Sequence, residues 1–437
     1  MSSIDVPVAA IPAAAPPATP LGRLITAMLS SNIGALVALL TPLQLLLTLH
    51  LTRIAGTDAA LSFGFVTGLG ALFALIANPL AGRISDRTAA RFGRRRTWIL
   101  TGALSGALAV FALGFTTEVW QVAVVWSLTQ ALFNFQQAAT SALLADQVPA
   151  LKRGTVSGTV GLAAALGPLL GIAAVSAITE PIIQWAVIAV LAAVLGVVAV
   201  ALLRDPQHTR TADQQTLSFV ELAKSFWLNP RRHPAFGWAW AIRFLITCAY
   251  ASGTYNAFFI MDRFGIAPDA VGGVVLTLSL ISVLLLAVTS VVGGLVSDRI
   301  RRQKPFVIAA GALAAGALIT MSFAQSLEVV YLATAGIGIG MGLFFSIDSA
   351  LCVRMLPSME NAGKDLAIIN MANTIPQSFV PFIAPLLLVI GGYSALYVTL
   401  AAFAVAGALC VLRLPEIGRE GDPRWALITR PDSVDAR

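Results

Sequence analysis

Long apolar runs separated by short polar connections fill almost the whole chain, and this pattern constrains the fold more than any other feature. An α-helix needs about 20 mostly apolar residues to cross a membrane. Only 11% of the 437 residues are charged, whereas soluble domains carry about 25%. We therefore predict an all-α membrane protein with twelve transmembrane helices. The expected spans are 22–50, 59–82, 97–116, 120–145, 154–179, 182–203, 234–261, 269–296, 305–325, 327–352, 364–389 and 391–413.

The basic residues predict how these spans are oriented. With the N-terminus in the cytoplasm, 25 of the 28 lysines and arginines fall in the tails or in the connections that follow even-numbered spans. Arg53 and Arg263 lie in connections on the other side, and Arg243 lies inside span seven. Because cytoplasmic loops carry the excess of positive charge, we predict a multi-pass protein of the cell membrane with both termini cytoplasmic. Charge confined to short loops also argues against nucleic acid as a partner.

A polar stretch near the middle of the chain divides the spans into two sets of six. The predicted units are a disordered cytoplasmic tail at 1–20, a six-helix bundle at 21–203, a cytoplasmic linker at 204–232, a second six-helix bundle at 233–413 and a cytoplasmic tail at 414–437. Within the linker, residues 217–228 are amphipathic, which predicts a helix lying on the membrane surface.

The two sets of spans share a charged motif. The stretch from Gly82 to Arg96, after span two, contains six arginines and one acid. Three of its positions recur after span eight: Gly82, Asp86 and Arg87 correspond to Gly294, Asp298 and Arg299. Two similar six-helix halves, related by an axis along the membrane normal, are a known repeat architecture of secondary transporters. The recurrence therefore predicts two pseudo-symmetric six-helix bundles.

These features together resemble the major facilitator superfamily. Beside the twelve spans and the repeat, the pattern G-x-x-x-D-R-x-x-x-R-x-G-R-R follows span two, where it comprises Gly82, Asp86, Arg87, Arg91, Gly93, Arg94 and Arg95. The resemblance implies a secondary transporter that moves a small-molecule substrate by alternating access, as a monomer surrounded by membrane lipids and without a cofactor. It also implies that the charged loop is a latch that stabilises one transport conformation.

Physical chemistry suggests a role for several residues of the expected latch. Gly82 lacks a Cβ and would let two helix ends approach closely. Asp86 can accept hydrogen bonds from a helix N-terminus or pair with an arginine. Arg94 to Arg96 are assigned to topology and to contact with lipid. The alternative for the whole stretch is a basic loop that only orients the chain in the membrane.

The counterpart of the latch is expected at the end of span four. Asp146 and Arg153 flank the connection that follows this span. We expect them to dock on Arg87 or Arg91. The alternative is a solvated loop end without a mechanical role.

Four stretches narrow the resemblance to the glycoside–cation and sucrose–proton symporters. They are Leu40-Thr-Pro-Leu-Gln44, Gly93-Arg-Arg-Arg96, Asn134-Phe-Gln-Gln137 and Ala142-Leu-Leu-Ala-Asp146. Ser141 stands where the sucrose group tends to carry arginine. This resemblance implies transport of a sugar or glycoside with a proton.

A competing signal lies in span five. Gly167-Pro-Leu-Leu-Gly171 resembles part of a motif of proton-coupled drug antiporters, with Ala163 and Ile172 in place of two of its glycines. The alternative is therefore proton-driven efflux of drugs or other amphipathic compounds.

Two ionisable residues stand out inside the predicted spans. Arg243 is in span seven and Asp348 is in span ten. A charge inside a bilayer costs at least about 2.5–3.5 kcal/mol, so each residue is expected to bind substrate, to carry a proton or to pair with the other. Asp348 is the candidate for proton coupling, and facilitated diffusion without a proton stays open.

Polar and aromatic residues inside the spans define a candidate substrate cavity. Amides in lipid are unfavourable unless paired, so they should face a wet cavity or a neighbouring helix. The candidate residues are Gln44, Asn134, Gln137, Arg243, Tyr250, Tyr255, Asn256 and Asn373. Amides and aromatic rings suit uncharged, hydroxyl-rich substrates.

The sequence offers little for other classes of function. No nucleotide-binding loop of the G-x-x-x-x-G-K-[ST] type occurs, which disfavours ATP-driven transport. The three histidines are scattered, and no metal site or enzymatic activity is predicted. A membrane sensor or scaffold that transports nothing is the remaining alternative from a different class.

Overall fold

The computed structural model describes residues 19–149, 152–205, 234–300, 302–354, 368–369, 371–373 and 375–414. The regular structure within these ranges is helical throughout. The expected surface helix at 217–228 and both expected tails lie almost entirely outside the described residues.

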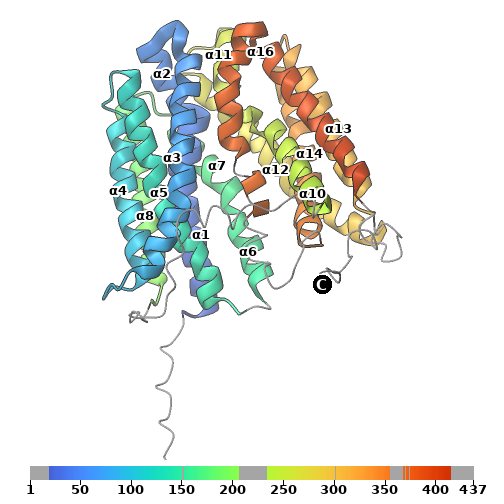
Figure 1. Cartoon of the computed structure of the whole chain (residues 1–437). Coiled ribbons are helices and arrows are strands. Elements are labelled where there is room, and N and C mark those ends of the chain that lie inside the picture. The colour runs from blue at the N-terminus through green and yellow to red at the C-terminus, as the bar shows by residue number, and fades with distance from the viewer. Residues whose placement is uncertain are drawn as a thin grey trace, which may run out of the picture.

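The first half of the chain contains the helices expected for spans one to six (Figure 1). They are α1 (Leu21–Thr41), the π-helix η1 (Pro42–Leu46), α2 (Leu47–Ala55), α3 (Ala59–Arg87), α4 (Arg94–Leu113), α5 (Val119–Gln147), α6 (Arg153–Gly161), α7 (Ala163–Val175) and α8 (Pro181–Leu202). The short 3-10 helix η2 (Gly56–Asp58) joins α2 to α3.

The second half contains the helices expected for the remaining spans. They are α10 (Pro234–Tyr250), the 3-10 helix η4 (Ala251–Tyr255), α11 (Asn256–Phe264), α12 (Val271–Ile300), α13 (Lys304–Ser322), α14 (Leu327–Arg354), α16 (Pro376–Cys410) and η5 (Val411–Arg413). Gly391 and Gly392 interrupt α16 with non-helical backbone angles, and Gly392 has φ +64°. This break separates the expected spans eleven and twelve.

The lengths of these helices agree with the twelve predicted spans. Among the described residues, nine continuous helical stretches are long and apolar enough to cross a membrane. One of these stretches, Leu21–Arg87, contains two consecutive predicted spans, and another, Phe379–Arg413, contains the end of the predicted span 364–389 and all of the span 391–413. Helix α5, whose second half is rich in amide and hydroxyl side chains, accounts for the predicted span at 120–145.

Helix starts follow local chemistry. Proline occupies the first turn of α8 and of α13, where its missing N–H leaves no helical hydrogen bond unmade. Glu118 and Gln121 form a capping box at the start of α5, which satisfies two otherwise unpaired backbone N–H groups. Some spans are nevertheless interrupted. In the first span the π-helix η1 begins at a proline, and in the fifth span α6 and α7 meet at Leu162.

Large apolar side chains point outward, as expected of a surface covered by lipid. Leu108, Leu284 and Phe382 are each more than 60% exposed. Small residues line the contacts between helices instead: a Cβ added at Gly102 would lie 2.9 Å from the Gln136 backbone nitrogen. Close helix packing through small residues is how membrane helices associate.

The two halves meet at one end of the molecule. Contacts between them join α3 to α16, α7 to α12 and η1 to η4. Phe63 lies 5.2 Å from the Tyr255 ring between centroids, and Gly64 packs directly on Pro385. We call this the far end, because it lies beside the loop after α2 and opposite the tail end, where α1 begins and α8 ends (Figure 1). Thr19 and Arg204, which flank these helix ends, are joined by a hydrogen bond.

Candidate functional site

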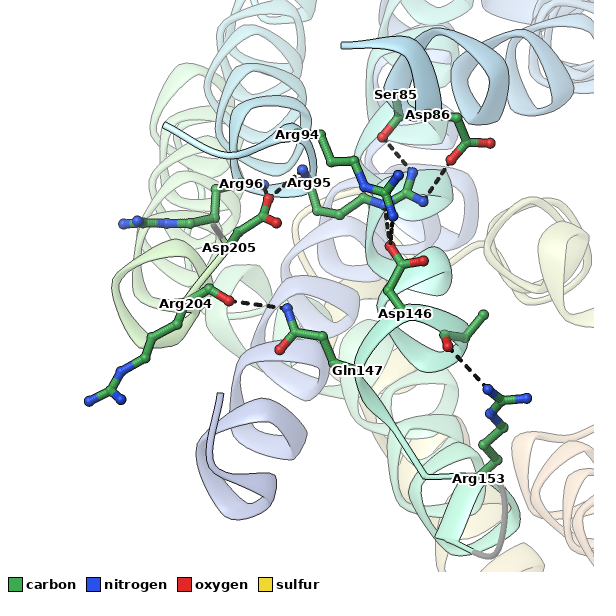
Figure 2. Close-up of polar contacts among 11 residues, drawn as sticks. Ser85, Asp86, Arg94, Arg95, Arg96, Asp146, Gln147, Arg153, Arg204 and Asp205 are labelled. Carbon is green, nitrogen blue, oxygen red and sulfur yellow. Dashed lines mark hydrogen bonds and ion pairs between the residues drawn. The ribbon is translucent and has the colours of Figure 1, made fainter. Parts of the chain in front are cut away.

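Five residues at the tail end form a compact charged group, which we call the Arg95 cluster. Arg95, in the first turn of α4, donates through Nη2 to Asp86 Oδ1 at 2.6 Å, through Nε to Asp146 Oδ2 at 2.8 Å and through Nη1 to Ser85 Oγ at 2.9 Å. Arg94 Nη2 lies 2.9 Å from the same Asp146 oxygen. Figure 2 shows the two acids converging on Arg95 from α3 and α5.

The chemistry of the guanidinium group explains why arginine occupies this position. Its planar fork has five donors, so one side chain can bind two carboxylates and a hydroxyl at the same time. The Arg95 side chain is only 4% exposed, whereas that of Asp86 is 53% exposed. The cluster therefore ties the end of α3, the start of α4 and the end of α5 together through one buried cation.

The structure corrects the predicted pairing in this loop. The acids Asp86 and Asp146 do come together, but they share Arg95, and Asp146 also pairs with Arg94. Arg87 and Arg91 are exposed. The expected contact with lipid was wrong for Arg94 and Arg95, which pair with these acids instead. Because α4 begins at Arg94, Arg95 lies on the helix face that is turned toward α3 and α5.

Arg153 has a different role from the predicted one. Its guanidinium donates to the carbonyls of Val148 and Ala145, both at 3.1 Å. A cation at a helix C-terminus satisfies carbonyls that have no intrahelical partner and complements the helix dipole. Arg153 therefore caps α5 and does not dock on the arginines of the loop after α3.

The glycines of the repeated motif make no close helix contact in this conformation. A Cβ added at Gly82 or Gly294 would meet no atom of the described residues within 4 Å. Arg299 is exposed at the end of α12, and the side chain of Asp298 lies outside the described part of the structure. The predicted close approach at Gly82 is therefore not made here.

A buried ion pair joins α10 to α14 in the second half. Arg243 Nη2 lies 3.0 Å from Asp348 Oδ2, and the two side chains are 13% and 4% exposed. Pairing was one of the three predicted roles for these residues. It places opposite charges together inside the membrane-spanning region, where a lone charge is costly.

Arg243 belongs to a stripe of polar and aromatic side chains on one face of α10. Trp240 Nε1 donates to the Ile368 carbonyl at 3.1 Å, and Thr247 Oγ1 lies 3.5 Å from Asn373 Oδ1. Tyr250 packs beside Phe344 of α14, with ring centroids 6.4 Å apart. The stripe thus lies between α14 and the described residues 368–369 and 371–373. It brings three predicted cavity residues and Asp348 into one region of the second half.

The amides of α5 act mainly between helices of the first half. Asn134 Oδ1 accepts from Asn78 Nδ2 of α3 at 3.1 Å, and Asn134 Nδ2 donates to the Gln130 carbonyl at 2.7 Å. Gln136 Nε2 donates to the Ser31 carbonyl of α1 at 3.0 Å. Asn134 therefore pairs with a neighbouring helix, which is the alternative role that we gave for such amides. Gln137, on the same helix, is half-buried.

The irregular segments of the first and seventh spans contact one another. η1 contains Gln44, whose side chain is half-buried, and η4 ends at Tyr255, next to Asn256 at the start of α11. Pro42 lacks an N–H and opens the π-helix, a form that is frequent at functional sites. In transporters, interrupted helices at the interface of the two repeats flank the substrate site.

Tyr255 and Asn256 differ in their surroundings. Tyr255 is buried in the junction of the halves, where its hydroxyl donates to the Pro381 carbonyl at 3.2 Å. Asn256 Oδ1 is buried without a hydrogen-bond donor among the described residues. Tyr255 is thus a contact of the far end, and Asn256 retains an available acceptor beside η4.

Sequence reasoning missed Ser85 and Asn78 and assigned Arg95 to the wrong role. Ser85 directly precedes Asp86, and Asn78 lies one turn before Gly82, so helical spacing around the motif is the signal that could have found them. Among the described residues, no group of three or more His, Cys, Asp or Glu could hold a metal ion.

Two helical halves, charged helix ends that meet at one face and a buried ion pair between spans define a multi-pass membrane transporter. The model of the Major Facilitator Superfamily matches residues 21–357 and 257–431. The chain therefore belongs to the Major Facilitator Superfamily.

Curated relatives match over limited segments. The multidrug resistance protein MdtG of Proteus mirabilis (strain HI4320) is 36% identical over 100 residues, which cover 23% of each chain. The sucrose transport protein SUT1 of Oryza sativa subsp. japonica is 31% identical over 185 residues, which cover 37% of this chain and 33% of that protein. These matches thus span only a quarter to a third of the relatives' length.

Solved structures share the fold over most of the chain. A mutant form of the nucleoside transporter NupG superposes with a TM-score of 0.68 at 14% identity, covering 89% of this chain and 99% of that one. The human organic anion transporter MFSD10 (TETRAN) superposes with a TM-score of 0.60 at 16% identity, covering 90% and 99%. At such low identity the likeness concerns the fold alone.

Proposed function

We propose that this transporter carries a small uncharged polar solute, a sugar or a glycoside, across the cell membrane together with a proton. The observation that carries this proposal is the neutralised charge in the second half. Arg243 is paired with Asp348 at 3.0 Å, so the surrounding region offers amides, hydroxyls and aromatic rings without a net charge. Such groups suit a ligand that is rich in hydroxyls and carries no charge of its own.

The aromatic side chains of the α10 stripe support the same class of substrate. Trp240 and Phe244 stack with ring centroids 5.2 Å apart and an angle of 8° between their planes. Aromatic faces complement the apolar C–H faces of a sugar ring, and nearby polar groups can orient its hydroxyls. The segment shared with the rice sucrose transport protein is in keeping with this assignment.

Asp348 is the proposed coupling residue. It is the buried acidic residue among the described ones, and its carboxylate faces a cation. Protonation of the carboxylate would weaken its attraction for Arg243 and free the guanidinium to change partners. A proton and a conformational change could be linked in this way without any further acid.

The Arg95 cluster is proposed to form the core of the latch. We place the tail end in the cytoplasm, because the basic residues gather there. With the halves joined at the far end, this conformation would then be the one open toward the cytoplasm. The latch would hold the opposite conformation, in which Gly82 would approach a helix of the second half.

A substrate screen tests the proposed function. Purified protein in liposomes should accumulate a labelled sugar or glycoside when the outside is acidified, and the same solute should raise the apparent melting temperature of the detergent-solubilised protein. A broad panel of sugars and glycosides that neither enters the liposomes nor shifts the melting temperature would contradict the proposal. Complete inactivity toward all solutes would favour a sensor or scaffold.

Efflux of amphipathic compounds is the second candidate, and the segment shared with MdtG favours it. The glycines of the Gly167–Gly171 motif have a structural role in this chain. A Cβ added at Gly167 would lie 2.7 Å from the Leu36 Cβ, and a Cβ added at Gly171 would clash with the Thr41 side chain. Deletion of the gene separates the two candidates: loss of an exporter should sensitise cells to toxic compounds, whereas loss of a symporter should impair growth on a sole carbon source.

A further inference from the structure

Asp205, just beyond the end of α8, contacts the start of a helix that is far away in the sequence. Its Oδ2 accepts hydrogen bonds from the backbone nitrogens of Arg95 at 2.6 Å and Arg96 at 3.0 Å (Figure 2). These N–H groups belong to the first turn of α4, which has no intrahelical acceptors for them. Asp205 thus caps α4 from outside the helix, with its negative charge at the positive end of the helix dipole.

The residue before α4 is shaped to receive this carboxylate. Gly93 has φ +99°, a region of backbone space that favours glycine. A Cβ at this position would lie 2.6 Å from Asp205 Oδ2 and 2.5 Å from the Asp205 carbonyl oxygen. The second glycine of the charged motif therefore leaves room for Asp205, which is a local reason for its presence that the motif alone does not provide.

The backbone immediately before Asp205 is held by a second set of hydrogen bonds. The Arg204 carbonyl accepts from Gln147 Nε2 and from Thr19 Oγ1, both at 3.1 Å. The Thr19 hydroxyl in turn accepts from the Arg204 nitrogen at 2.9 Å. Gln147 directly follows Asp146, the partner of Arg95. Asp205 is thereby fixed relative to both partners of the Arg95–Asp146 ion pair.

We infer that Asp205 is a positioning residue for the latch: by capping α4 it holds Arg95 in the orientation that binds Asp86 and Asp146. This inference rests on the proposed latch. Arg95 contributes its backbone N–H to Asp205 and its side chain to the two acids, so rotation of the first turn of α4 would move both contacts together. Asp205 acts on the two acids through the placement of Arg95.

The inference is tested with Asp205→Ala, which removes the cap, and Asp205→Asn, which keeps an acceptor oxygen at the same distance. Labelled solute uptake gives KM and maximal rate, and spin-label distances between the two halves give the ratio of the two conformations. We expect Asp205→Ala to change that ratio about two- to thirtyfold, the range for loss of one helix cap. The maximal rate should fall, KM should stay within about twofold, and Asp205→Asn should restore most of the loss.

Glu118→Ala is the matched control, because Glu118 caps α5 at the far end and lies away from the Arg95 cluster. It should lower the melting temperature as Asp205→Ala does and leave the ratio of conformations unchanged. An equal change of the ratio in both variants would overturn the inference, since any lost cap would then suffice. A wild-type ratio in Asp205→Ala would overturn it as well.

Asp86→Asn separates this inference from the proposal on which it rests. If Asp86→Asn shifts the ratio of conformations and Asp205→Ala does not, the latch stands and the positioning role fails. If Asp86→Asn itself behaves as wild type, the latch fails. In the double variant Asp86→Asn/Asp205→Ala, the shifts should be less than additive, because both act through Arg95; additive shifts would contradict the inference.

Discussion

Arg243 and Asp348 form an ion pair between α10 and α14, with Nη2 and Oδ2 3.0 Å apart and both side chains largely buried. Neither residue has a charged neighbour nearby in the sequence, and they are separated by two complete spans. Each charge offsets the free-energy cost of burying the other, since either charge alone inside the membrane region would be costly.

The first expected consequence concerns stability. Asp348→Asn or Arg243→Gln alone should destabilise the protein by about 3–5 kcal/mol, because each removes the charged partner that the other buried charge has at 3.0 Å. The double variant should recover most of this loss, since it removes both charges together. Thermal unfolding in detergent measures the effect. Equal destabilisation by the single and double variants would mean that the attraction between the two charges contributes little.

The same carboxylate is expected to couple transport to protons. Asp348→Asn in proteoliposomes should abolish uphill accumulation of solute driven by an acid outside, and it should spare exchange of labelled for unlabelled solute, which needs no net proton movement. Asp262→Asn, on α11 at the far end, is the control and should accumulate solute normally. Accumulation that survives Asp348→Asn would assign the residue a structural role only.

The Arg95 cluster should be sensitive to the geometry of its cation. Arg95→Lys keeps the charge but replaces the planar fork by one compact ammonium, so it should not reproduce the three contacts to Ser85, Asp86 and Asp146. Loss of one hydrogen bond to a charged group is worth about 1.5–3 kcal/mol, so the transport rate should fall about tenfold or more.

The variants Asp86→Asn and Arg95→Lys should both reach the membrane in normal amounts, because the remaining basic residues still set the orientation of the chain. Arg83→Lys, in the last turns of α3, is the matched control. Transport rates and membrane abundance are measured in parallel. A wild-type rate for Arg95→Lys would show that its charge alone suffices.

The sequence predicted the helices well, because a membrane span depends on the length and apolarity of one continuous segment. Each of the twelve predicted spans overlaps a helix in the described part of the chain, and Arg243 and Asp348 stood out because charge is rare in such segments. Breaks inside spans were harder to foresee: Pro42 opens a π-helix, whereas Pro79 lies within the continuous helix α3.

The detailed pairing at the tail end could not be predicted in the same way. Which arginine faces Asp146 depends on the residue at which α4 begins, and a shift by one residue turns a helix by about 100°. The role of Asn134 was difficult to predict for a similar reason. On a helix that is buried on two sides, an amide side chain can face either a cavity or a neighbouring helix. Asp205 caps a helix that starts over a hundred residues earlier, a contact that local patterns do not encode.

The last expectation concerns the far end, where Gly64 of α3 packs directly on Pro385 of α16. Any larger side chain at this position must push the halves apart, because a proline ring cannot rotate out of the way. Gly64→Val should therefore disfavour the conformation described here and populate one that is open at the far end. A cysteine placed at Phe258, which packs on Phe63 in this junction, should then react faster with a membrane-impermeant maleimide, about tenfold if the clash costs about 1.4 kcal/mol.

Gly273→Val is the control, because a Cβ at that position of α12 would meet no described atom within 4 Å. Unchanged labelling in Gly64→Val, with the control also unchanged, would show that local packing at the far end accommodates the larger side chain while the halves stay together.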